Sequence, residues 1–558
     1  MASSSSLLAP AGPAVAGRPR GGAARLDGLG AVRGALWVAV GALVLLPIAA
    51  IVALAATGGG WTQLADPAVL DAAVNSLVSA ALSGALAVVV GTSLALLLER
   101  TDLPGRRALR LLALSPLLMP PFVGAIAWLS LLGPSSPVNA WWSARFGAPL
   151  WNLYGGDGVV FLLAVHGYPV AMMIVTAALR RVPADLEQAA RIAGSSAGRA
   201  MTAITLPLLR PAMLSSFTLI AVSNLADFGI PSIIGLPERY VTLSTLVYRY
   251  LQSGTVDDPL AVVAAIGFVL LVIALLGVVV DLLRSRTRVE LDGQAAAPDR
   301  LPLGRARIPV GIAASALVLA ITVLPLVTLT AQSLLPAPGV PFTPENITLA
   351  SFERALTASG TLTGIGNSVM LAVSAAVVCG LLGLAIGTLV TRTRARDNAG
   401  LLGLALLPQA IPGLVIAVAW LVIAPSIGLY NTPWIILCAY LTSFLALVVQ
   451  SVSAPLAATP GTAEEAARVA GASRLRALWD ISCRMAVPAA LSGAVLVALT
   501  AVRELTLSVL LLSPGSQTLG VVIFNLQQAG AYNASSALSL IVALVGLAGL
   551  GLTARSSR

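Results

Sequence analysis

Two carboxylates lie where ionised side chains are rare, well inside long apolar stretches of the sequence. They belong to Asp227 and Glu504, and one offset of 277 residues superimposes the first on the second. At 1.5 Å per residue, each lies roughly 24 Å along its expected helix from the proline near the start of that helix. A charge at such depth is costly if it faces lipid, so both positions favour the wall of a central pathway. A structural role for each, as a helix cap or an ion-pair partner, is an equal alternative.

Other side chains that could do chemistry are few. Arg503 precedes Glu504 and is a third candidate for the pathway, but adjacent helical residues point about 100° apart, so the two are not expected to pair. The single histidine is His166, in an apolar run, and the three cysteines are widely spaced at Cys379, Cys438 and Cys483. These residues offer neither a metal-ligand cluster nor an activated nucleophile. We therefore expect no metal site and no catalytic residue.

All 33 basic residues are arginines. A phosphate-binding loop of the Walker type needs a lysine, so the chain is not expected to hydrolyse ATP by that route. Of the 558 residues, 58% are hydrophobic and only 10% are charged. No soluble domain of this size buries so much apolar surface, and the composition predicts an all-α membrane protein that crosses the bilayer many times.

Twelve apolar segments are long enough to span a bilayer, six in each half of the chain. They lie at roughly 34–56, 72–98, 111–133, 158–179, 212–234 and 260–280, and then at 308–333, 366–390, 399–424, 433–456, 489–512 and 535–553. Residues 1–33 are expected to form a disordered basic tail, and 284–307 an arginine-rich connector. If both ends and the connector are cytoplasmic, 28 of the 33 arginines fall on that side, which is the positive-inside pattern.

The two halves, 34–283 and 308–558, are related by an internal repeat. Asn75-Ser76 matches Asn367-Ser368 at an offset of 292, and Arg100 matches Arg392 at the same offset. The offset falls to 277 further along, because the first half carries about 15 extra residues, which map to the Trp- and Gly-rich segment 133–158. Since each half has six spans, the copies share one orientation, and we expect a parallel duplication.

The most informative repeat is polar. Glu187-Gln188-Ala189-Ala190 is followed by Gly194, and Glu464-Glu465-Ala466-Ala467 by Gly471, all at the 277-residue offset. Each copy forms helix for about two turns and is then broken by the glycine, before a proline leads into the next apolar run. The pattern predicts a short surface helix, a turn and a return into the membrane, within segments 181–211 and 457–488.

These loops resemble a known signature. Glu-Ala-Ala-x-x-x-Gly, nine residues and then Ile-x-Leu-Pro is the cytoplasmic loop motif of the inner-membrane permeases of binding-protein-dependent ABC importers. The second copy matches at Glu465, Ala466, Ala467, Gly471 and Ile481 but has Cys483-Arg484 in place of Leu-Pro. The first matches at Ala189, Ala190, Gly194, Ile204, Leu206 and Pro207 but has Gln188 at the glutamate position, with Glu187 one residue earlier.

In that family the loop forms a coupling helix that sits in a groove of the ATPase subunit. The resemblance therefore implies that one set of residues in each copy couples the chain to two copies of an ATPase: Glu187, Gln188, Ala189, Ala190 and Gly194 in the first, and Glu464, Glu465, Ala466, Ala467 and Gly471 in the second. It also implies an extracytoplasmic solute-binding protein as partner, and a bacterial plasma membrane location with both termini cytoplasmic. No cofactor is expected on this chain, which would be a translocation subunit and not an enzyme, because ATP and Mg would be used by the partner subunits. Membrane lipid is an expected partner, and nucleic acid is not.

The surroundings of the two buried carboxylates narrow the resemblance. The stretches Asp227-Phe228-Gly229-Ile230-Pro231 and Arg503-Glu504-Leu505 are similar to the corresponding stretches of iron(III) permeases. Thiamine and phosphonate permeases are close relatives with the same fused layout, so these solutes remain alternatives. A twelve-helix secondary transporter driven by an ion gradient is an alternative of another class, but it would have no need of the repeated cytoplasmic loop.

Overall fold

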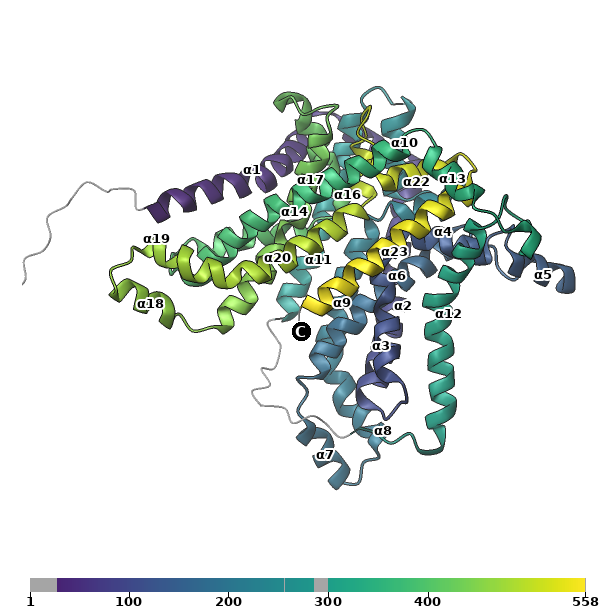
Figure 1. The fold of residues 1–558 in the computed structure, drawn as a ribbon, viewed down its shortest axis with the longest axis horizontal. Coiled ribbons are helices and arrows are strands. Elements are labelled where there is room, and N and C mark those ends of the chain that lie inside the picture. The colour runs from purple at the N-terminus through teal and green to yellow at the C-terminus, as the bar shows by residue number, and fades with distance from the viewer. Residues whose placement is uncertain (1–27, 255, 286–299, 557–558) are drawn as a thin grey trace, which may run out of the picture.

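Figure 1 shows the computed structural model, a body of long helices with short helices and loops at its ends. The structure describes residues 28–254, 256–285 and 300–556. Within these ranges, extended backbone pairs only at one bridge, between Thr101 and Leu301, and the expected all-α class is confirmed. Most of the expected basic tail and most of the connector lie outside the described residues.

The elements follow the expected order of spans. The first half contains α1 (Gly28–Thr57), α2 (Pro67–Arg100), α3 (Arg106–Leu114), α4 (Pro121–Leu132), α5 (Pro137–Phe146), α6 (Gly156–Leu179), α7 (Ala184–Ile192), α8 (Ala197–Ala200), α9 (Leu206–Leu225), α10 (Leu243–Ser253) and α11 (Pro259–Ser285). The second half contains α12 (Arg307–Ser333), α13 (Ala350–Thr357), α14 (Thr361–Arg392), α15 (Asn398–Leu406), α16 (Gly413–Ile423), α17 (Pro433–Ala458), α18 (Thr462–Val469), α19 (Arg474–Ala477), α20 (Arg484–Val502), α21 (Thr506–Leu510), α22 (Leu519–Gln528) and α23 (Tyr532–Ser556).

Ten helical segments among the described residues are long and apolar enough to cross a membrane. An eleventh span is a bent pair of segments, 398–410 and 413–427, whose two arms meet at 106°. Pro412 stands at this bend, where its missing N–H and its ring prevent a continuous helix. The twelfth expected helix falls on α23, of which Tyr532–Gly546 is a shorter apolar helix.

The first helix of each half packs against the other half. Helix α1 lies against α16 of the second half as well as α11 of its own, and α12 lies against α4 of the first half as well as α23 of its own. Figure 1 shows this exchange, with α1 beside the helices of the second half and α12 beside those of the first. The hydroxyl of Thr442 on α17 donates to the carbonyl of Leu43 on α1 at 2.8 Å, which is a hydrogen bond between the halves. The two halves are therefore interlocked.

Within each half, small residues let two long helices approach closely. A Cβ on Gly91 of α2 would lie 2.6 Å from the carbonyl oxygen of Tyr168 on α6. At the equivalent place in the second half, a Cβ on Gly383 of α14 would lie 2.6 Å from the side chain of Val448 on α17. Close backbone approach of this kind is typical of helix packing in membranes. Each half therefore contains one closely packed pair of helices, α2 with α6 and α14 with α17. The polar loop of each half follows the second helix of its pair.

Candidate functional site

The two polar repeats form short surface helices, α7 and α18, and both end as the sequence predicts. Gly194 and Gly471 adopt φ of 91° and 92°, a left-handed conformation that favours glycine. The N–H of the next residue then donates to a carbonyl five positions back, from Ser195 to Ala190 at 2.9 Å and from Ala472 to Ala467 at 3.0 Å. This hydrogen bond closes the helix end and turns the chain.

After the turn, both loops return to the helical body through the same order of elements. Ser196 and Ser473 cap the short helices α8 and α19 with their hydroxyl groups. A turn of π-helix follows in each half, at η3 (Met201–Thr205) and at η10 (Leu478–Cys483). These turns lead directly into the membrane helices α9 and α20. The expected helix, turn and return are therefore present twice.

The two faces of α7 and α18 differ sharply. On the outer face, Gln188, Ala189, Arg191 and Gly194 are exposed in the first half, as are Glu465, Ala466, Arg468 and Gly471 in the second. Ala190 and Ala467 are half-buried. We call these two outer surfaces the docking faces. Figure 1 shows α7 and α18 at the tips of the helical body, remote from α10, α13 and α22.

Two residues of the docking faces were missed by the motif. Ile192 is 88% exposed and Val469 is 91% exposed, and the 277-residue offset superimposes them. An exposed branched apolar side chain thus stands at the same place in both copies, uncovered by the rest of the described chain. The repeat itself carried this signal, because both copies have a branched apolar residue directly after the arginine of the motif.

Two other residues of the motif point away from the docking faces. Glu187 forms an ion pair with Arg100 at 3.4 Å and accepts a hydrogen bond from the hydroxyl of Thr205. Glu464 forms an ion pair with Arg392 at 3.0 Å and accepts a hydrogen bond from Ser482 at 2.5 Å. Both glutamates therefore face the body of their own half, whereas Gln188 and Glu465 face outward.

The second set of candidate residues meets at a cavity between the two halves. This cavity has a volume of about 560 Å³ and is lined by residues of α6, α9, the bent pair and α17. Asp227 and Glu504 both line it, and so do Asn224 and Gln409. The carboxylates thus lie where residues of the first half meet residues of the second.

Each carboxylate also caps a helical turn. Helix α9 ends at Leu225, and the Asp227 carboxylate then accepts a hydrogen bond from the N–H of Ile230 at 2.9 Å. Helix α20 ends at Val502, and Glu504 accepts from the N–H of Leu507 at 2.8 Å and of Ser508 at 3.2 Å. Both roles weighed from the sequence, lining and capping, are therefore present in the same side chains.

Arg503 has a different partner. Its guanidinium donates to the carbonyl of Leu117 in the first half, and it is not among the described residues that line the cavity. As expected, it does not pair with Glu504 but bridges the two halves. His166 does line the cavity, and its Nδ1 atom lies 3.0 Å from the carbonyl oxygen of Leu162. Its ring lies in space left by Gly124, where a Cβ would be 2.4 Å from the imidazole.

Among the described residues, no group of three or more His, Cys, Asp and Glu side chains is placed to hold a metal ion. The cavity is lined mainly by apolar side chains, with the polar side chains of Asn224, Asp227, Gln409 and Glu504 among them.

Comparison with known proteins agrees with this arrangement. The model of the family described as "binding-protein-dependent transport system inner membrane component" matches residues 87–289 and 381–558. The chain belongs to this family. Each match covers one of the two loops and one of the two cavity-lining carboxylates, so the expected duplication of a permease unit is confirmed, and the chain is an ABC importer permease of the membrane.

Relatives with curated names include ferric and molybdenum permeases. A ferric transport system permease protein of Actinobacillus pleuropneumoniae is 26% identical over 85% of this chain and 69% of its own length. An Fe(3+)-transport system permease protein of Haemophilus influenzae is 24% identical over 82% of this chain and 84% of its own length. A probable molybdenum ABC transporter permease protein of Haloferax volcanii is 32% identical, over 41% of this chain and 84% of its own length.

Among solved structures, a chain of a bacterial ABC transporter involved in the import of alginate aligns with a TM-score of 0.36. It is 18% identical, over 45% of this chain and 98% of its own length.

Proposed function

We propose that this chain is the membrane-spanning subunit of an ATP-driven importer of ferric iron. The observation that carries the proposal is the pair of docking faces, built alike in both halves and attached to the helices that line one shared cavity. Two ATPase subunits would bind the docking faces, and an external binding protein would deliver the solute to the opposite side. Both termini and both docking faces would then be cytoplasmic, in agreement with the arginine distribution.

The transport step follows from this geometry. Closure of the ATPase subunits would move α7 and α18, and with them the helices that run from each loop to the cavity. A solute moves in one direction only if the outward-facing and inward-facing states bind it with different affinity. The chain itself needs no cofactor for this step, because ATP and Mg would be bound by the partner subunits.

Iron is favoured over molybdenum by two observations. The ferric relatives match most of this chain, whereas the molybdenum relative matches 41% of it. The cavity between the halves also carries two carboxylates, Asp227 and Glu504, which suit a hard cation and disfavour an oxyanion such as molybdate. Thiamine and phosphonate importers share the fused layout and serve as further solutes to test.

The first test is to purify the chain from its native membrane in mild detergent and to identify the proteins that accompany it. We expect a stoichiometric ATPase subunit. The complex is then reconstituted in proteoliposomes with its binding protein, and uptake of radioactive ferric iron, molybdate, thiamine and phosphonate is compared. Iron uptake that requires ATP supports the proposal. A chain that purifies alone and moves solute under an ion gradient would instead be a secondary transporter.

A further inference from the structure

Each docking helix is tied to its own half by a buried ion pair that occupies the same place in both copies. Glu187 pairs with Arg100 at the end of α2, and Glu464 pairs with Arg392 at the end of α14. The glutamates superimpose at the 277-residue offset and the arginines at the 292-residue offset. The side chain of Arg100 is 2% exposed and that of Arg392 is 10% exposed, so water screens neither pair strongly.

A hydroxyl group joins each pair from a third element. Thr205 belongs to η3, directly before α9, and Ser482 belongs to η10, directly before α20. Helices α9 and α20 end just before Asp227 and Glu504 at the cavity. Each inward glutamate thus joins three elements. It belongs to the docking helix, and its side chain contacts both the end of a long membrane helix and the turn before the helix that leads to the cavity.

The end of α2 that carries Arg100 also contacts the segment that leads into α12, the first helix of the other half. In the first half, Leu301 pairs with Arg100 and Asp102 through backbone hydrogen bonds of 2.8 and 3.3 Å. Asp102 in turn accepts from the N–H of Leu303 at 2.9 Å, and its carbonyl accepts from Arg307 at the start of α12 at 3.0 Å. A movement of Arg100 therefore reaches α12.

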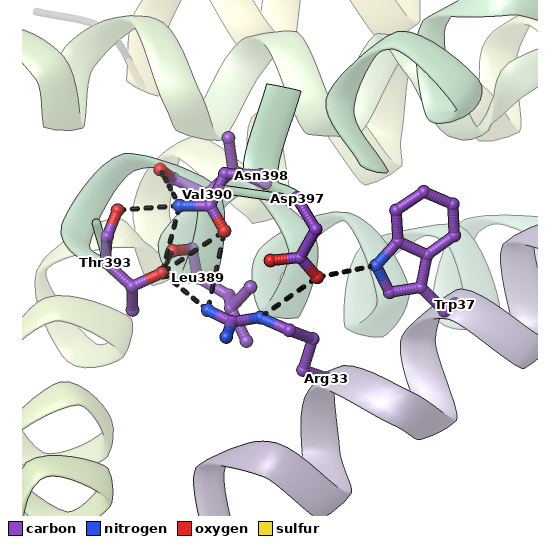
Figure 2. Close-up of polar contacts among 7 residues, drawn as sticks. All are labelled: Arg33, Trp37, Leu389, Val390, Thr393, Asp397 and Asn398. Atoms are coloured by element: carbon purple, nitrogen blue, oxygen red, sulfur yellow. Dashed lines mark hydrogen bonds and ion pairs between the residues drawn. The ribbon is translucent and has the colours of Figure 1, made fainter. Parts of the chain in front are cut away.

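In the second half, the residues after α14 hold α1 in a similar way but with different side chains, which Figure 2 shows. Arg33 of α1 donates to the hydroxyl of Thr393 at 2.9 Å and lies 3.7 Å from the carboxylate of Asp397. Trp37 of α1 donates to Asp397 at 3.0 Å, and Asn398 donates to the carbonyl of Thr393 at 2.6 Å. Thr393 directly follows Arg392, so α1 is held beside the second ion pair.

We infer that Glu187 and Glu464 are positioning residues that transmit the movement of the docking helices to both halves, and that they do not themselves contact the ATPase. A buried ion pair alone is weak evidence for any role. Here the same link is built twice, with threonine in one copy and serine in the other, and each time it lies between the docking face and the helices of the cavity. The inference rests on the proposed function, because it presumes an ATPase at the docking faces.

The test uses the complete complex of permease, ATPase subunits and binding protein in proteoliposomes. Two variants weaken the second link, Glu464→Gln and Ser482→Ala, and Glu465→Gln on the docking face is the matched control. Two quantities are measured: the amount of ATPase subunit that co-purifies, and the ratio of ATP hydrolysis with and without binding protein loaded with ferric iron.

We expect both variants to retain the ATPase subunit. The stimulation ratio should fall by about five- to fiftyfold in Glu464→Gln and by severalfold in Ser482→Ala. Glu465→Gln should instead reduce the amount of bound ATPase. The exchange of charges in the double variant Glu464→Arg with Arg392→Glu should recover part of the stimulation, which a change in docking alone would not do.

Full stimulation in both Glu464→Gln and Ser482→Ala, with the ATPase bound at the normal amount, would overturn the inference. Ser482→Ala decides the matter if Glu464→Gln does not fold, because it removes one hydroxyl and leaves both charges in place. A failure of the proposed function looks different, since the unaltered chain would then retain no ATPase subunit at all.

Discussion

The two loops that carry the docking faces are built alike but are held with unequal strength. Arg392 contacts Glu464 at 3.0 Å and also donates to the carbonyl and the hydroxyl of Thr459, at 2.9 and 2.7 Å. Arg100 lies farther from Glu187, at 3.4 Å, and position 182, which corresponds to Thr459, is a valine without a hydroxyl. The second loop is therefore fixed to α14 and to the end of α17, whereas the first is fixed mainly to α2.

The docking faces differ in the same direction. The second presents the charged Glu465 where the first presents the neutral Gln188. Duplication thus produced two copies of one device, of which the second is both more charged and more firmly braced. We expect the second loop to tolerate less change than the first.

The largest effect is expected at the glycines that end the docking helices. Valine at φ near +90° is strained by about 1–3 kcal/mol, and nothing lies within 4 Å of a Cβ at either glycine, so the cost is in the backbone. Gly471→Val should abolish stimulated ATP hydrolysis, and Gly194→Val should reduce it less, because the first loop can relax. Stimulated hydrolysis in proteoliposomes is the measurement.

Gly198→Ala is the control for the first loop, because Gly198 lies in the same loop as Gly194, with open space around it and without a left-handed backbone. It should behave as the unaltered chain. If Gly471→Val and Gly194→Val lose stimulated ATP hydrolysis to the same extent, the two loops do not differ in stiffness.

The next effect concerns the two cavity carboxylates. Glu504 accepts two backbone hydrogen bonds with two oxygens, and a glutamine has one oxygen, so Glu504→Gln leaves one N–H without its partner at a cost of about 1–3 kcal/mol. Asp227 accepts one such bond, which an asparagine oxygen can keep. Both variants should lose iron uptake, but only Glu504→Gln should lower the unfolding temperature.

Uptake assays and thermal unfolding of the purified chain separate these effects. The double variant Asp227→Asn with Glu504→Gln should impair uptake far more than assembly with the ATPase. Normal uptake in the double variant would leave both carboxylates with the capping role alone.

The smallest effect comes from the extra brace of the second loop. Thr459→Val removes one hydrogen bond to Arg392 and should destabilise the chain by about 1.5 kcal/mol. The reverse change, Val182→Thr, offers Arg100 a hydroxyl and should stabilise it by a smaller amount. Unfolding temperatures of both variants in detergent test this, and an unchanged midpoint for Thr459→Val would show that the brace contributes nothing.

Features within a single stretch of chain were predictable from the sequence. The helix breaks at Gly194 and Gly471 follow from the local conformation that glycine adopts, and the duplication follows from fixed offsets. The position of Asp227 and Glu504 inside apolar runs also indicated that neither faces lipid, and both line the cavity. Here the residue type and its neighbours carry the information.

Features that depend on distant partners were not predictable. Nothing in Glu187-Gln188 or Glu464-Glu465 indicates which side chain faces inward, since the partner arginines lie 87 and 72 residues earlier in the chain. The exchange of α1 and α12 between the halves leaves no periodic trace, because an apolar helix looks the same whichever neighbour it packs on. Pro412 inside the apolar run 399–424 indicates that the helix is interrupted, but not that its two arms meet at 106°.

The exchange of first helices sets the order in which the protein can be completed during its synthesis. Helix α1 leaves the ribosome roughly 350 residues before α16, which at 5–20 residues per second is a delay of about 20–70 s. During that time, the side of α1 that contacts α16 in the finished protein must face lipid or an assisting insertion factor. The N-terminal half is therefore a waiting intermediate, and truncated chains that end before α16 should be targets for membrane proteases.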